Sequence, residues 1–200
     1  MSLECGGKAA ALLFVATLFA CQSTHPTGAP MQPIAASTPD QALQKLNAID
    51  EAKALMRIRL ITPEKTQSFT AQLQLGKSAM TLIAYTPLNT TAMRVHADER
   101  GVEIVNELEH TTWHGTPAEF GAKFGFFGAV TPHDMARLMI GLPAASPDVR
   151  HEATAAGLAR ATAGDVVVTY DPPSFPPSRV TIVRGAQRVE IVVNEVVESR

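Results

Sequence analysis

The sequence predicts an α+β domain in which one curled antiparallel sheet forms a half-open β-barrel and helices cover the concave face. Short segments of alternating apolar and polar residues follow one another over 56–107 and again over 166–197, separated by turn residues. Helical spacing is confined to residues 38–53 and 116–143. Because an antiparallel sheet with one buried face twists and curls, helices packed against that face would leave an apolar concavity.

The chain begins with the pattern of an export signal. Residues 9–20 carry no charge, Lys8 precedes them, and the run is too short to span a bilayer as a mature helix. Residues 18–21, Leu-Phe-Ala-Cys, resemble the lipobox of bacterial lipoproteins, whose cysteine is acylated after the preceding peptide is removed. We therefore expect a signal peptide at 1–20 and lipidation at Cys21. Ordinary export and a buried N-terminal helix are the alternatives.

Composition excludes several classes of protein. The formal net charge is −2 and no cluster of Lys or Arg occurs, which argues against nucleic-acid binding. Cys5 would leave with the signal and Cys21 would be capped by lipid, so no thiol is left for a disulfide, a metal site or a nucleophile. The residues that follow are enough for one domain.

A flexible tether is expected at 21–37, where Ser, Thr, Pro, Gly and Ala dominate and apolar periodicity is missing. A helix should start behind it, with Thr38 as N-cap and Pro39 at the first position, and should end near 50–53. Its apolar face would consist of Ala42, Leu43, Leu46 and Ile49.

Period-two alternation predicts a meander of short strands after this helix. Turn signals at 76–77, 86–89 and 98–101 separate the segments. The expected strands are 56–60, 69–75, 80–85, 93–96 and 102–107.

Two helices are expected to interrupt the strands. Thr116 and Glu119 have the spacing of a capping box, and Thr131 followed by Pro132 starts the second helix, which residues 141–143 end. Strands resume at 166–170, 179–183 and 188–197, with a proline-rich loop between the first two, since proline does not fit a central strand.

This order of elements resembles the LolA/LolB-like family, and within it the outer-membrane receptors more than the periplasmic carriers. The resemblance covers about residues 43–197. Its most specific parts are the turn at 86–91, Thr-Pro-Leu-Asn-Thr-Thr, and the run at 138–143, Leu-Met-Ile-Gly-Leu-Pro. The terminal strands after a proline-rich loop and the lipidated N-terminus also fit.

The resemblance implies that residues 38–200 form a lipid-binding domain of an outer-membrane lipoprotein receptor. Such a receptor accepts acylated lipoproteins from a LolA-like periplasmic carrier in an apolar cavity and inserts them into the membrane. It implies no enzyme activity, no cofactor and no nucleic-acid partner, and we expect a monomer. The chain would be lipid-anchored in the outer membrane and face the periplasm, which Gln22 in place of an Asp after the cysteine also favours.

The family's protruding loop leucine, which enters the membrane lipid, maps onto Leu88. The family usually has glycine at the next position, where this chain has Asn89. Because asparagine tolerates left-handed backbone, the turn can survive the exchange.

Apolar residues of the strands and inserted helices are expected to line the lipid cavity. Methionine adapts to irregular partners, which suits varied acyl chains, although the same residues are compatible with an ordinary core. The expected lining residues are Met56, Ile58, Phe69, Leu73, Met80, Leu82, Met93, Val95, Phe120, Phe124, Phe127, Met135, Leu138 and Met139.

Enzyme and metal sites find little support. His110 and His114 would lie roughly 13 Å apart on a strand, too far to share one metal ion. A Gly-x-Ser-x-Gly elbow is missing. Two non-enzymatic functions stay open beside the receptor: an envelope lipoprotein that binds free lipid or glycolipid, and a structural or assembly lipoprotein that binds a protein partner by strand addition. A large dry cavity would favour lipid handling, and a filled core with an open sheet edge would favour a protein partner.

Overall fold

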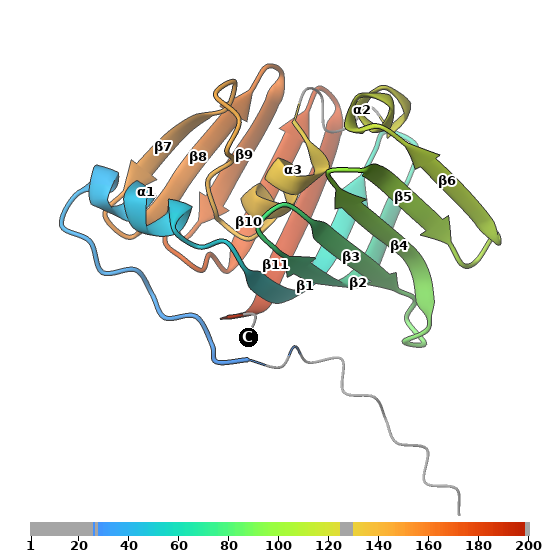
Figure 1. Ribbon diagram of the computed structural model, residues 1–200, viewed down its shortest axis with the longest axis horizontal. Helices are drawn as coiled ribbons and strands as arrows, with labels where there is room; N and C mark the ends of the chain where they lie inside the picture. The colour runs from blue at the N-terminus through green and yellow to red at the C-terminus, as the bar shows by residue number, and fades with distance from the viewer. Residues whose placement is uncertain (1–25, 27, 125–129, 199–200) are drawn as a thin grey trace, which may run out of the picture.

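The computed structural model describes residues 26, 28–124 and 130–198. Within them, eleven strands form one antiparallel sheet in the order β6-β5-β4-β3-β2-β1-β11-β10-β9-β8-β7. The sheet curls without closing, and the helices lie on its concave side (Figure 1). The predicted fold class is confirmed.

The helices are α1 (Pro39–Asn47), α2 (Pro117–Phe124) and α3 (Pro132–Met139). The strands of the first half are β1 (Ala52–Ile61), β2 (Thr66–Leu75), β3 (Met80–Tyr85), β4 (Thr91–Asp98), β5 (Gly101–Asn106) and β6 (Thr111–Gly115). Those of the second half are β7 (Arg150–Thr154), β8 (Gly157–Ala163), β9 (Val166–Asp171), β10 (Arg179–Arg184) and β11 (Gln187–Glu198).

All three helices begin where the sequence predicts. The Thr38 and Thr131 hydroxyls accept hydrogen bonds from the backbone N–H groups of Gln41 and Asp134. At α2 the capping box is complete, because Thr116 N donates to Glu119 Oε2 at 2.7 Å and Glu119 N donates to Thr116 Oγ1 at 3.2 Å.

Helix α1 ends at Asn47, earlier than the predicted 50–53, because β1 already starts at Ala52. Ala52 pairs with Leu75 of β2 and with Glu198 of β11, so tertiary pairing on both sides extends the strand beyond its apolar alternation. Strands β6, β7 and β8 were not predicted. In β8 the buried positions include Ala161 and Ala163, and alanine gives little strand signal.

Each helix covers a different part of the sheet. Helix α3 packs in the concavity against β2, β3 and β4, α2 lies against β5, and α1 lies against β7 and β8 (Figure 1). The concavity is therefore filled unevenly, with α3 as its central cover.

Part of the predicted tether contacts the sheet. Met31 N donates to Val196 O at 2.9 Å, and Glu198 N donates to Ala29 O at 3.0 Å. A Cβ at Gly28 would lie 2.3 Å from Glu198 O, so glycine permits the close approach. The predicted signal peptide and Cys21 lie outside the described residues.

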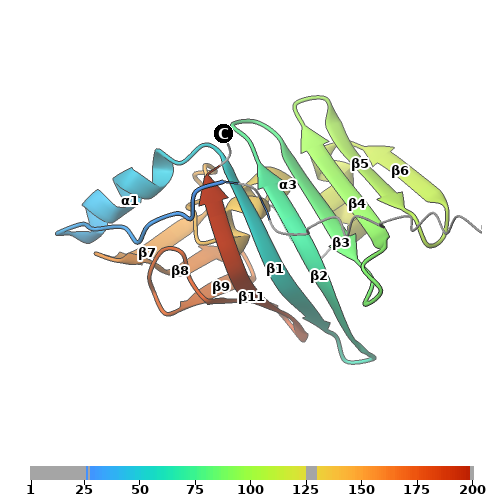
Figure 2. The same ribbon diagram turned by 90° about the horizontal axis from the view of Figure 1, so that it is seen from below.

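The sheet has two distinct ends. Antiparallel pairing brings the turns at 62–65, 86–90 and 107–110 to one end, which we call the Leu88 end. The C-terminus and the paired residues 29–31 lie at the opposite end, as do the turns at 76–79 and 99–100. Figure 2 shows the turns of the Leu88 end below and the C-terminus above.

Candidate functional site

An apolar cavity of about 290 Å³ lies between the concave face of the sheet and α3. Among the described residues, every side chain that lines it is apolar. The lining residues are Ile58, Leu60, Phe69, Met80, Leu82, Met93, Val95, Ile104, Phe120, Pro132, Met135, Ala136, Met139, Ile182, Val189 and Ile191.

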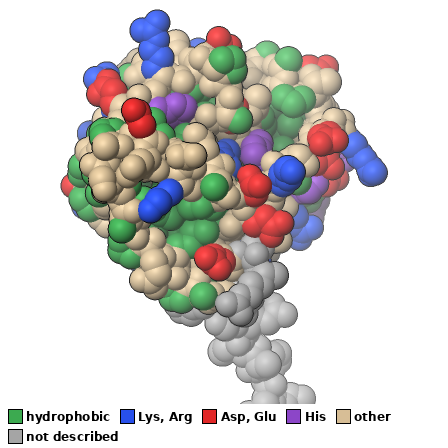
Figure 3. Space-filling view, turned by 60° about the vertical axis from the view of Figure 1, so that its left-hand side comes forward, with side chains coloured by type: hydrophobic (Ala, Val, Ile, Leu, Met, Phe, Trp, Pro, Cys, Tyr) green, Lys and Arg blue, Asp and Glu red, His purple; other side chains and the backbone are tan. Residues whose placement is uncertain are grey.

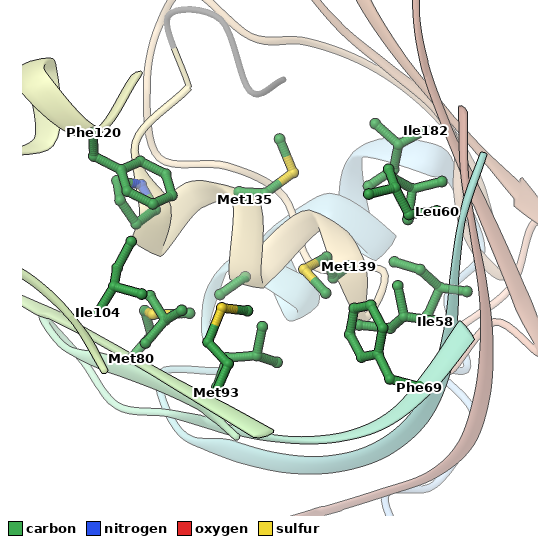
Figure 4. Close-up of a pocket in the computed structure, with 16 residues that line it drawn as sticks. Ile58, Leu60, Phe69, Met80, Met93, Ile104, Phe120, Met135, Met139 and Ile182 are labelled. Carbon is green, nitrogen blue, oxygen red and sulfur yellow. The ribbon is translucent and has the colours of Figure 1, made fainter. Parts of the chain in front are cut away.

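Strand alternation and helical spacing place these side chains. Ile58 and Leu60 point inward on β1, whereas Arg59 between them points outward and lies 3.7 Å from Glu190. Met135 and Met139 are four residues apart on α3 and so project from one face of the helix. Figure 4 shows these two methionines among the side chains that rise from the strands.

Most of the predicted lining residues lie in this wall: Ile58, Phe69, Met80, Leu82, Met93, Val95, Phe120, Met135 and Met139. Met56, Leu73 and Leu138 do not line the cavity but lie in the fully buried core. On β1 and β2, Met56 and Leu73 are nearer to the end of the sheet opposite Leu88, where the interior is filled. The side chain of Phe124 and the whole of Phe127 lie outside the described residues.

Seven lining residues were not predicted. Ile182, Val189 and Ile191 lie on β10 and β11, which the alternation did predict as strands. Their side chains lie beside those of β1 because Ile191 pairs with Ile58, Val189 pairs with Leu60, and Ile182 pairs with Val189. This pairing joins the first half of the chain to the second, and no local pattern predicts it. The others are Leu60, Ile104, Pro132 and Ala136.

The cavity size limits what it can hold. At about 30 Å³ for one water-sized group, 290 Å³ has room for about ten such groups. Because the described side chains of the wall offer no hydrogen-bond partners, water gains little by entering. The cavity therefore suits a slim hydrocarbon segment of about ten carbons.

Buried polar groups fix α3 from the side away from the cavity. Arg137 Nε donates to Pro143 O at 2.6 Å and Arg137 Nη1 donates to Ile49 O at 3.0 Å. Asp134 Oδ1 accepts from Ala145 N at 2.6 Å. Burial lowers the pKa of Arg137, while the nearby Asp134 carboxylate acts in the opposite direction. These bonds tie the helix to the segment that follows it and to the α1–β1 connection.

A neighbouring histidine contributes to the same region. The ring Nε2 of His151 accepts from Ala144 N at 3.1 Å, which requires this nitrogen to be unprotonated. Burial is the main cause that lowers the pKa of His151. The fold thus favours the neutral ring that the hydrogen bond needs.

The β3–β4 turn presents Leu88 to solvent. Leu88 is 87% exposed, the highest value among the large apolar side chains of the described residues. Thr86 N donates to Thr90 O at 2.9 Å, and the two threonine hydroxyls lie 2.7 Å apart. Asn89 has a φ of 61°, the left-handed conformation anticipated for it. The turn is ordered by its own hydrogen bonds, although the side chain of Leu88 is almost wholly exposed.

The histidines considered for a metal site do not form one. His110 lies in the β5–β6 turn with a φ of 52°, and His114 on β6 lies 3.7 Å from Glu103. In the part of the chain that the structure describes, no group of three His, Cys, Asp or Glu side chains is placed to hold a metal ion. No helix in that same part is long and apolar enough to cross a membrane.

Known proteins resemble this chain in structure and not in sequence. No family model and no curated protein matches the sequence. A DUF1329 family protein from Desulfovibrio piger superposes with a TM-score of 0.54 at 8% identity, over 78% of this chain and 89% of that one. A putative outer membrane lipoprotein-sorting protein domain from Vibrio parahaemolyticus gives 0.52 at 9% identity, over 80% and 93%.

The chain shares with these two proteins the fold of a half-open barrel made from one curled antiparallel sheet. A LolA superfamily protein from Nitrosomonas europaea gives a TM-score of 0.48 at 10% identity, over 82% of this chain and 95% of that one. At such identities the likeness establishes the architecture, and the function has to be argued from the cavity and the Leu88 turn.

Proposed function

We propose that this protein is an outer-membrane lipoprotein receptor that holds acyl chains of its cargo in the cavity beneath α3 and passes them to the membrane. The cavity beneath α3, whose described lining is entirely apolar, is the observation that carries this proposal. The domain from Vibrio parahaemolyticus with the same fold adds support, since its name describes a putative outer membrane lipoprotein-sorting protein. Binding and transfer of this kind need no catalytic residue and no cofactor.

The cavity size sets the strength of binding that the proposal requires. Burying one methylene contributes about 0.8 kcal/mol, so about ten contribute about 8 kcal/mol before the costs of association. This corresponds to a dissociation constant near the micromolar range at best. A bilayer buries the whole length of each chain, so transfer from the cavity to the membrane is downhill.

The proposal also includes the envelope location. Lipidation at Cys21 would anchor the chain to the outer membrane facing the periplasm, with a LolA-like carrier as the donor of cargo. The exposed Leu88 would enter the lipid surface during release, since a leucine without packing partners gains about 1.5–3 kcal/mol by leaving water.

Native mass spectrometry of the chain without its signal peptide tests the proposal. We expect co-purified acylated ligands, and displacement of a fluorescent fatty acid by a synthetic acylated lipopeptide but not by the same peptide without acyl chains. A chain that carries no acyl ligand and takes up no fluorescent fatty acid would contradict the proposal. Recovery of glycolipid or free lipid alone would favour a protein that binds free lipid.

A further inference from the structure

A second exposed leucine lies on another turn of the Leu88 end. Leu108 in the β5–β6 turn is 65% exposed, second only to Leu88 among the large apolar side chains of the described residues. The turn is ordered, because Asn106 Oδ1 accepts from Leu108 N at 3.1 Å and from Glu109 N at 3.2 Å. The side chain is therefore held out by its own backbone.

Strand β4 brings the two turns together. Its first residue, Thr91, pairs with Tyr85 at the end of β3, and Met93 pairs with Asn106 at the end of β5. The turns are thus about two strand spacings apart, roughly 10 Å. Figure 2 shows both at the same end of the sheet.

The cavity wall extends towards this end. Leu60 is the second-last residue of β1, and its partners Gln67 and Val189 are near the starts of β2 and β11. Leu60 and Val189 both line the cavity. A surface that meets the two leucines is therefore close to the hydrocarbon that the cavity would hold.

The charges at this end favour an electrically neutral lipid surface. The turn at 86–90 has no ionisable side chain. Glu107 in the β5–β6 turn lies 3.7 Å from Arg94. Asp165, just before β9, lies 2.8 Å from Arg184 at the end of β10. Figure 3 shows a different face, on the side of β7 and α1, where side chains of both signs are also interspersed. Without a basic excess there is little attraction to anionic lipid.

We propose that Leu88 and Leu108 insert together, as a two-point contact, into a zwitterionic phospholipid surface and so dock the Leu88 end on the membrane. This proposal rests on the proposed function, because docking through these two leucines would place the cavity beside the bilayer for transfer of acyl chains. One leucine gives weak and unoriented attachment. Two leucines on turns fixed by one strand ladder add their partition energies and define how the domain faces the membrane.

Vesicle binding tests this contact. The chain without its signal peptide and with Cys21→Ser, which removes the acylated thiol, is floated with phosphatidylcholine vesicles. We expect Leu108→Ser and Leu88→Ser each to lower the partition coefficient about tenfold or more, and the double variant to lower it about a hundredfold. Val192→Thr is the matched control, because Val192 is 42% exposed in the middle of β11, and it should change nothing.

Several outcomes would overturn the two-point contact: no binding of the parent chain, unchanged binding of the Leu108 variant, or binding that appears only with anionic vesicles. Uptake of a fluorescent fatty acid in solution, without vesicles, is measured on the same proteins. Leu108→Ser should leave it unchanged. If the parent chain takes up no fatty acid, the proposed function is contradicted. If the parent takes up fatty acid but Leu108→Ser binds vesicles as strongly as the parent, only the docking contact is contradicted.

Discussion

A larger side chain on α3 that fills part of the cavity tests whether the cavity binds a ligand or is only a packing defect. Ala136 is fully buried and lines the cavity, and Ala136→Leu adds three carbons at a position where leucine also favours a helix. The new side chain takes the space of about three of the ten carbons that the cavity can hold. At about 0.8 kcal/mol each, an acyl ligand loses about 2.4 kcal/mol, or roughly 50-fold in affinity.

The same substitution should not harm the fold. Because the added carbons enter an existing void, we expect the free energy of unfolding to stay constant or rise. Ala161→Leu is the control, since Ala161 is also fully buried but does not line the cavity. There the extra volume should destabilise by about 1–3 kcal/mol and leave affinity unchanged.

Two assays read out the pair of variants. Titration with a fluorescent fatty acid gives affinity, and urea unfolding followed by circular dichroism gives stability. If Ala136→Leu binds as tightly as the parent chain while remaining folded, the acyl chain does not occupy this cavity. If Ala136→Leu is destabilised like Ala161→Leu, the cavity is not open in solution.

Three further substitutions test separate parts of the reasoning. Leu88→Glu should leave acyl binding in solution intact but abolish incorporation of a lipoprotein into vesicles, and normal incorporation would remove the assigned role of the turn. Tyr170→Phe should leave stability unchanged or raise it by about 1 kcal/mol, because the Tyr170 hydroxyl is buried without a hydrogen-bond partner among the described residues; clear destabilisation in urea would show that this hydroxyl is satisfied. Because burial lowers the pKa of His151 in the fold, the unfolded chain binds more protons, so stability should fall as pH drops below the ordinary value of 6.5. His151→Gln keeps an acceptor for Ala144 N and should flatten this part of the pH profile of thermal unfolding, and an unaltered profile would place the titration elsewhere.

The helix starts and most strands could be predicted because each depends on residues close together in the sequence. The caps at Thr38, Thr116 and Thr131 require only hydrogen bonds within one helical turn, and all three occur as expected. Strand alternation likewise marked most of the sheet. By contrast, β8 buries alanines, whose small side chains carry a weak strand preference and depend on pairing with β7 and β9.

The cavity shows the limit of such signals. Met56 and Ile58 occupy equivalent positions of the β1 alternation, yet one lies in the filled core and the other lines the cavity. What distinguishes them is the distance along the strand from the Leu88 end, together with the position of α3. Val189 and Ile182 reach the wall because β11 pairs with β1 and β10 with β11, which places Val189 beside Leu60 and Ile182 beside Val189. The position of α3 and the pairing of distant strands depend on residues far apart in the sequence, and the period-two pattern of one strand does not contain them.

The pairing of residues 29–31 with β11 gives the molecule two opposite poles. At about 3.3 Å per residue, the ten residues of β1 extend for about 33 Å between them. From Ala29 back to Cys21 the chain can stretch at most about 28 Å. If Cys21 carries the proposed acyl chains, the anchor and the two leucines at the opposite end could not both reach one flat bilayer with the strands perpendicular to it while this pairing holds. The domain would then have to lie with its strands along the membrane, or residues 29–31 would have to unpair from β11 and lengthen the connection to Cys21.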